Sequence, residues 1–136
     1  MAYYSVVEGT MDQSPQKWSI VETEEYGIWF ESLDPDAQDA IAAKVGVLKA
    51  VGPSLGRPAV DSIKGSRFPN MKELRVKSQK RPFRIFFAFD PERQAVLLVG
   101  GNKAGAGDKT FYAKMIPLAD KLFREYLEAT ENEKRK

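Results

Sequence analysis

Three apolar segments between residues 71 and 102 are separated only by short turns, and this pattern strongly limits the possible folds. In the first segment, Leu74 and Val76 alternate with charged residues, as expected of a strand with one buried face. The second segment, 83–89, alternates in the same way, and the third, 95–99, is apolar on both faces. Short turns join antiparallel neighbours, so the region predicts an antiparallel β-meander.

Apolar residues at helical spacing precede this meander. A helix is predicted over 23–33, where the Thr23 hydroxyl can cap the first turn. A second helix is predicted over 34–51, with Asp34 as its capping residue and Pro35 in its first turn. The two helices are expected to form an antiparallel hairpin.

The remaining segments complete an α+β fold. A short first strand is predicted near 18–22, and 54–70 is rich in Gly, Pro and Ser, which indicates a long loop with one short extended piece. A glycine-rich loop at 100–107 leads to a C-terminal helix over 111–126. Pro117 should kink or split this last helix because proline cannot donate a backbone hydrogen bond.

The chain has 136 residues, which suits a single domain over 1–136 with a loose N-terminal arm at 1–16 and a fraying charged tail at 129–136. It contains no Cys and no His, so thiolate and histidine chemistry are excluded. Acid–base catalysis would have to use Glu, Asp, Lys, Arg or Tyr. We find no signal peptide profile and no apolar run long enough to span a bilayer, and we therefore expect a cytoplasmic protein without a membrane partner.

The net charge of +2 is unevenly distributed. Residues 1–56 carry three Lys and Arg against nine Asp and Glu, a balance of −6. Residues 57–114 carry thirteen against five, a balance of +8, and residues 115–136 carry five of each. A basic zone beside apolar strands favours an anionic partner such as nucleic acid, although a merely solvated sheet face would give the same composition.

Three motifs in order resemble the RelE/ParE toxin superfamily, in particular its HigB-like, phage-derived branch. They are KELR, then PFRIFFAFD, then LLVGGNK followed by a helix that contains a tyrosine. The resemblance covers roughly residues 17–128. It implies an α+β domain in which two N-terminal helices pack on one face of a twisted antiparallel sheet and the other face is basic.

The resemblance also implies a function. Members of this superfamily include toxins of type II toxin–antitoxin pairs that cleave mRNA, commonly on the ribosome. For this chain we expect cleavage without a metal or other cofactor. Their partner is a small antitoxin with a helix-turn-helix DNA-binding domain. Some HigB-like enzymes use histidines, which this chain lacks, so the resemblance leaves either the Lys, Arg and Tyr chemistry of RelE or a loss of nuclease activity.

RNA cleavage needs a deprotonated 2′-hydroxyl, a stabilised phosphate transition state and a protonated leaving oxygen. Arg84 matches the RelE-like arginine that contacts the scissile phosphate, or else it is a surface cation that packs its stem on Phe86. Glu73 is the candidate carboxylate base, or else it only forms an ion pair with Arg75 or Arg84. Arg75 would assist Arg84.

Two further candidates follow the meander. Lys103 could hold the RNA backbone or protonate the leaving oxygen, and Tyr112 matches the tyrosine that RelE-like enzymes place near the phosphate or a base. The alternatives are a solvated lysine and a half-buried core aromatic. Five other cations are expected to contact RNA without taking part in the chemistry, namely Lys72, Lys77, Lys80, Arg81 and Lys109.

Two other functions fit the same sequence. A ParE-like member of the superfamily would inhibit DNA gyrase by binding protein, without any catalytic group. A noncatalytic nucleic-acid-binding regulatory module would use the basic sheet face for affinity alone.

Overall fold

The computed structural model describes residues 4–7, 18–105 and 107–134. The described strands are β1 (Tyr4–Val7), β2 (Ser19–Thr23), β3 (Val60–Ser62), β4 (Met71–Ser78), β5 (Arg81–Phe89) and β6 (Gln94–Asn102). The helices are α1 (Glu24–Glu31), α2 (Pro35–Val51), the short 3₁₀ turn η1 (Gly52–Ser54) and α3 (Asp108–Lys134). None of these helices combines the length and the apolar character needed to cross a membrane.

The strands form one sheet in the order β1-β2-β6-β5-β4-β3. The predicted meander is confirmed, because β4, β5 and β6 pair antiparallel in sequence order. The prediction of a wholly antiparallel sheet was wrong, because β2 pairs parallel with β6. The chain between these two strands contains both N-terminal helices and three strands, which gives the long crossover that parallel pairing requires.

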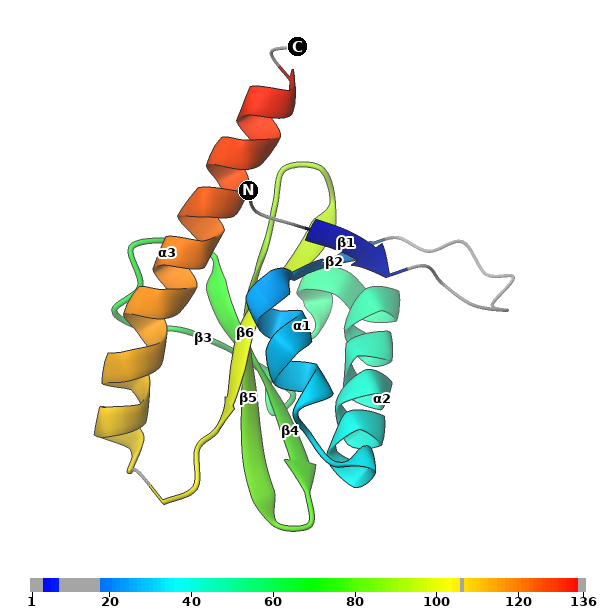
Figure 1. The fold of residues 1–136 in the computed structure, drawn as a ribbon, viewed down its shortest axis with the longest axis vertical. Coiled ribbons are helices and arrows are strands. Elements are labelled where there is room, and N and C mark those ends of the chain that lie inside the picture. The colour runs from blue at the N-terminus through cyan, green and yellow to red at the C-terminus, as the bar shows by residue number, and fades with distance from the viewer. Residues whose placement is uncertain (1–3, 8–17, 106, 135–136) are drawn as a thin grey trace.

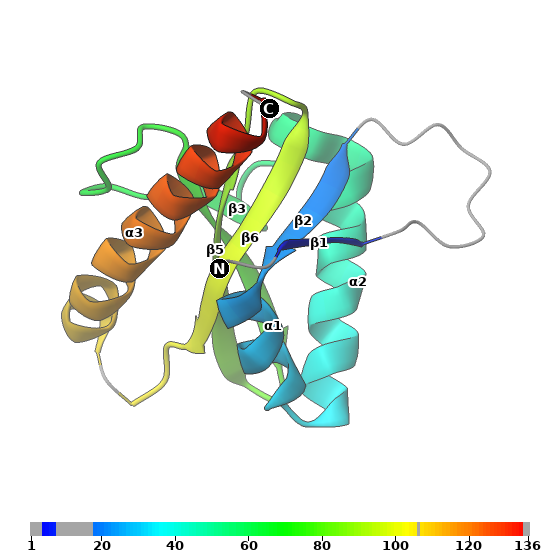
Figure 2. The same ribbon diagram turned by 45° about the horizontal axis from the view of Figure 1, so that its top comes forward.

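Helices cover both faces of the sheet, with α1 and α2 on one side and α3 on the other (Figures 1 and 2). Helices α1 and α2 pack on one face as expected, but the expectation of a basic opposite face was only partly right, because α3 covers an apolar part of that face. Val96 and Leu98 on that second face are buried under α3, together with Phe86 and Ala88. A strand that is apolar on both faces needs a covering layer on each.

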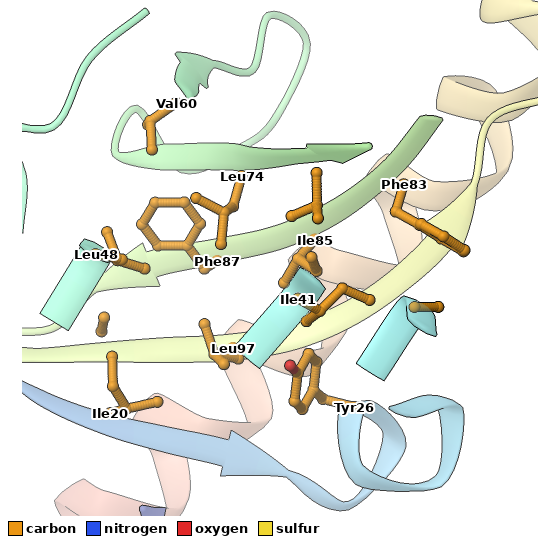
Figure 3. Close-up of a cluster of buried hydrophobic side chains, with 13 residues drawn as sticks. Ile20, Tyr26, Ile41, Leu48, Val60, Leu74, Phe83, Ile85, Phe87 and Leu97 are labelled. Carbon is orange, nitrogen blue, oxygen red and sulfur yellow. The ribbon is translucent and has the colours of Figure 1, made fainter. Parts of the chain in front are cut away.

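The first core lies between the sheet and the N-terminal helices (Figure 3). Ile41 and Leu48 of α2 and Tyr26 of α1 are buried against side chains of the sheet such as Leu97. Packing is close at Gly100 of β6, where a Cβ atom would lie 2.3 Å from the Trp29 ring. The aromatic residues of α1 therefore pack in the core, as their helical spacing predicts.

The two N-terminal helices begin where the sequence predicts, but only one is capped as expected. The Thr23 hydroxyl accepts a hydrogen bond from the Tyr26 backbone N–H at 3.1 Å and donates one to the Leu98 carbonyl at 2.6 Å. The Asp34 side chain makes no capping hydrogen bond. Instead, its carboxylate accepts two hydrogen bonds from Arg81, at 2.9 and 3.1 Å, which tie the β4–β5 turn to the α1–α2 turn.

Both ends of the chain differ from the prediction. Within the predicted loose arm, Tyr4–Val7 forms β1 and pairs antiparallel with β2, while residues 1–3 and 8–17 lie outside the described residues. Helix α3 continues through Pro117, so it is not split, and it extends to Lys134 rather than ending before the tail. Lys134 Nζ lies 2.5 Å from Glu92 Oε1, and this ion pair holds the end of the helix against the β5–β6 turn. Residues 135–136 of the tail are outside the described part.

Candidate active site

The pairing of β4 with β5 brings distant charged residues together on the face covered by α3. In this register Arg75 lies directly opposite Arg84, and Glu73 lies opposite Phe86. Tyr112 lies in the first turns of α3, and its hydroxyl donates a hydrogen bond to Glu73. The structure therefore brings together four of the five predicted catalytic residues, drawn from two strands and one helix.

Glu73 is at the centre of this group and is only 2% exposed. One carboxylate oxygen accepts a hydrogen bond from Arg75 Nε at 2.8 Å, and the other accepts one from the Tyr112 hydroxyl at 2.5 Å. Arg84 Nε lies 3.8 Å from the carboxylate. The ion pair that the sequence left as an alternative role for Glu73 is thus present, and it holds two guanidinium groups and a phenol around one buried anion.

Arg84 keeps unused hydrogen-bonding capacity. Its side chain is 13% exposed, and Nη1 donates to the Phe83 carbonyl at 3.0 Å. Its Nε is buried and has no hydrogen-bond partner among the described residues. An unsatisfied buried donor is unfavourable, so a small movement that offers this group an anionic oxygen would be stabilising.

Burial, followed by the hydrogen bond to Glu73, raises the pKa of Tyr112 to about 12, and Arg84 offsets part of this rise. The neutral phenol is the form that these surroundings favour, because a phenolate would lie beside the Glu73 carboxylate. At neutral pH Tyr112 is therefore a hydrogen-bond donor. It can accept a proton only if it passes its own proton on at the same time.

This shift predicts a pH dependence that Tyr112→Phe should remove. The folded pKa lies above the ordinary value of 10, so the stabilisation from the phenol is complete below pH 10 and is lost as the pH rises towards about 12. The advantage of the wild type over Tyr112→Phe in the free energy of unfolding, measured by urea titration at several pH values, should shrink in that window. A difference that stays constant through pH 12 would contradict the environment described for Tyr112.

Three of the four residues, Glu73, Arg75 and Tyr112, line a cleft of about 530 Å³ between β3, β4 and the start of α3. Arg84 is not part of the cleft lining, and its Nε lies 3.8 Å from the Glu73 carboxylate. The charged lining of the cleft consists of four cations and three carboxylates, namely Arg57, Lys64, Arg75, Lys103, Asp61, Glu73 and Asp108. Lys103, the fifth predicted catalytic residue, borders this cleft, and its Nζ lies 3.2 Å from Asp108 Oδ1. The cations are therefore already partly neutralised, and the cleft suits a single phosphodiester group better than several phosphates at once.

Sequence reasoning missed the contribution of the loop around β3. Arg57, Asp61 and Lys64 border the cleft, and Arg75 Nη2 donates to Asp61 at 3.0 Å. The prediction of one short extended piece in 54–70 is confirmed by β3, which contains Asp61 and is flanked by Arg57 and Lys64. Charged residues that flank the extended piece of a long loop beside a basic strand were the available signal.

The five predicted RNA contacts do not form one surface. Lys77 is exposed and shares the strand face of Arg75, while Lys109 is exposed at the start of α3. Lys72 alternates to the opposite face, which α1 and α2 cover. Arg81 is engaged by Asp34, and its guanidinium carbon lies 5.3 Å from the centre of the Phe83 ring, whereas Lys80 lies in the β4–β5 turn. Lys72 and Arg81 thus lie apart from the cleft.

Most of the chain matches a known protein family. The family described as phage derived protein Gp49-like matches residues 28–124, which include the whole candidate site. The chain belongs to this Gp49-like family. The resemblance to the HigB-like, phage-derived branch that the sequence motifs indicate is thereby confirmed.

Two relatives of this Gp49-like protein come from Mycobacterium tuberculosis. One, named "Putative toxin HigB2", is 45% identical over 116 residues, which are 85% of this chain and 57% of the relative. The other, named "Putative toxin HigB3", is 46% identical over 99 residues, which are 73% of this chain and 84% of the relative. The chain thus spans little more than half the length of the first of these proteins. No solved structure matches it.

Proposed function

We propose that this protein is the toxin of a type II toxin–antitoxin pair and acts as a metal-independent endoribonuclease on mRNA, either free or on the ribosome. The observation that carries the proposal is the group of Arg75, Arg84 and Tyr112 around Glu73, beside the charged cleft. The names of the two relatives support the toxin role. The expected partner is a cognate helix-turn-helix antitoxin, and the expected location is the cytoplasm.

The proposed reaction is transfer of the phosphodiester to the neighbouring 2′-oxygen. A bond forms between this oxygen and phosphorus while the bond from phosphorus to the 5′-oxygen breaks. The products are a 2′,3′-cyclic phosphate and a 5′-hydroxyl. Arg84 and Arg75 would donate hydrogen bonds to the phosphate oxygens, where negative charge develops in the transition state.

Burial of Glu73 determines how a proton could leave the 2′-hydroxyl. Glu73 is only 2% exposed, which leaves little room for direct contact with the substrate, but its Oε1 accepts a hydrogen bond from the Tyr112 hydroxyl at 2.5 Å. We infer a relay in which the Tyr112 oxygen takes the 2′-proton as its own proton moves to Glu73. The Lys103 ammonium at the cleft would give a proton to the leaving 5′-oxygen and regain one from solvent, while the proton on Glu73 would leave to solvent through Tyr112 by the reverse of the relay.

The test is to incubate the purified protein with RNA in the presence of EDTA and to determine the chemistry of the new ends. We expect fragments with 2′,3′-cyclic phosphate and 5′-hydroxyl ends, and toxicity on expression that the product of an adjacent antitoxin gene relieves. Intact RNA together with inhibition of gyrase supercoiling would assign the ParE-like function instead. RNA binding without cleavage would assign the noncatalytic module.

A further inference from the structure

Asp120 is a buried carboxylate that the proposed reaction does not use. It lies on α3 and is only 7% exposed. Its Oδ1 accepts a hydrogen bond from the Ser66 hydroxyl at 2.5 Å, and its Oδ2 accepts one from the Arg67 backbone N–H at 2.9 Å. Both donors belong to the loop that joins β3 to β4, and neither is a cation. A buried carboxylate is unfavourable unless strong hydrogen bonds compensate it, so these two bonds are the reason that the charge is tolerated here.

Three consecutive residues of this loop are attached to α3. Besides the bonds from Ser66 and Arg67, the Phe68 ring packs edge-on against Phe123 of α3, with ring centres 5.0 Å apart. The Ser66 hydroxyl oxygen also accepts a hydrogen bond from the Phe68 backbone N–H at 3.0 Å, which orders this part of the loop. The loop therefore lies beside the middle of α3 (Figures 1 and 2).

The residues just before this attachment form part of the wall of the charged cleft. Ile63 and Lys64 line the cleft from the loop, and α3 contributes lining residues that include Tyr112. Asp120 lies on the same helix, eight residues after Tyr112, which is about 12 Å along the helix axis. One carboxylate thus joins two walls of the cleft and limits how far they can separate.

We propose that Asp120 is a positioning residue for the charged cleft, because it fastens the β3–β4 loop to α3 and keeps this wall ordered before RNA binds. The proposal rests on the proposed function and adds to it a residue that touches neither the substrate nor the reacting atoms. A loop that is already ordered loses less conformational entropy when a ligand binds to it. Asp120 therefore acts on the affinity for RNA and not on the rate of the chemical step.

Four variants separate this role from a general effect on the fold. Asp120→Ala removes both hydrogen bonds to the loop, and Asp120→Asn keeps one oxygen that can accept from one of the two donors. Ser66→Ala removes one bond from the side of the loop and leaves α3 unchanged, so it tests the proposal if Asp120→Ala does not fold. Tyr126→Phe is the matched control. It removes another hydrogen bond between α3 and a buried carboxylate, the 2.7 Å bond to Asp90, which does not line the cleft.

Limited digestion with trypsin tests the attachment of the loop without any use of RNA. Two possible cleavage sites lie in the loop, after Lys64 and after Arg67. Under native conditions Asp120→Ala should be cut at these sites about tenfold faster than the wild type, because the lost hydrogen bonds raise the population of the open loop. Tyr126→Phe should be cut there at the rate of the wild type. Equal rates in Asp120→Ala and Tyr126→Phe would show a general loss of stability and would overturn the inference.

RNA binding tests the effect of the loop on the cleft. The dissociation constant for noncleavable 2′-O-methyl RNA, measured by fluorescence anisotropy, should rise about tenfold in Asp120→Ala and less in Asp120→Asn. The single-turnover cleavage rate at saturating protein should stay within about twofold of the wild-type rate, since the chemical groups are unchanged. Adding Ser66→Ala to Asp120→Ala should cause no further loss of affinity, because both changes break the same bond. Normal RNA binding in a variant whose loop is open to trypsin would overturn the inference.

Failure of the proposed function would give a different result. If the wild type binds RNA but does not cleave it, the nuclease proposal fails, while weaker binding by Asp120→Ala still supports the positioning role. If the wild type neither binds nor cleaves RNA, the cleft has no role towards RNA and both proposals fail.

Discussion

Replacing Arg84 by alanine should slow RNA cleavage by about 10²- to 10³-fold, which corresponds to about 3 to 4 kcal/mol of transition-state stabilisation. The reason is the position of its guanidinium, which lies beside Glu73, is largely enclosed and has a buried Nε without a hydrogen-bond partner among the described residues. A group held in this way stabilises developing charge more than an exposed cation does, because the surrounding protein screens it less than water. Single-turnover cleavage of one defined oligonucleotide measures the effect.

Arg81→Ala is the matched control for this experiment. Arg81 lies on the same strand but is bound to Asp34 on the side of the N-terminal helices, so its loss should leave the cleavage rate close to that of the wild type. Arg84→Lys keeps the charge but loses the planar fork of donors, and it should recover only part of the activity. If Arg84→Ala cleaves as fast as Arg81→Ala, the assignment of Arg84 to the phosphate is wrong.

The alternation of charged and apolar residues in the meander made a large part of the site predictable. It placed Glu73, Arg75 and Arg84 on one strand face, and the pairing of β4 with β5 then sets Arg75 opposite Arg84. The same rule excludes Lys72 from this face, because successive side chains in a strand point to opposite sides. The prediction of Lys72 as an RNA contact rested on its place in the basic segment and did not take this alternation into account.

Features that depend on contacts between distant residues could not be predicted in this way. The parallel pairing of β2 with β6 produces no periodic pattern in the local sequence of either strand. Similarly, no residue near Asp34 in the sequence indicates that its carboxylate binds Arg81 instead of capping α2. The sequence of 95–99 partly indicates that the second face of the sheet is buried, since a strand that is apolar on both sides needs a packed layer on each side. The burial of Glu73 follows from that cover, and it is the reason why the proposed relay has Glu73 act through Tyr112 and not as a direct base.

Glu73→Ala should lower the free energy of unfolding by about 3 kcal/mol. The carboxylate is almost fully buried and serves Arg75, Arg84 and Tyr112 at once, so its removal leaves two cations and a phenol without their shared partner. Urea unfolding at neutral pH measures the change. Asp34→Ala removes an Arg–carboxylate pair at the surface, where water can replace the lost partner, and it should cost much less. Equal stability of Glu73→Ala and wild type would show that the buried ion group contributes nothing net.

The same variant should change RNA binding and RNA cleavage in opposite directions. Without Glu73, the cleft gains one unit of positive charge, and the guanidinium groups of Arg75 and Arg84 no longer share an internal anion, so 2′-O-methyl RNA should bind more tightly, most clearly at low salt. Cleavage should nevertheless fall, because the Tyr112 proton would have no acceptor in the proposed relay. Tighter binding with faster cleavage would instead mean that Glu73 only competes with the phosphate for the arginines, and the relay would have to be abandoned.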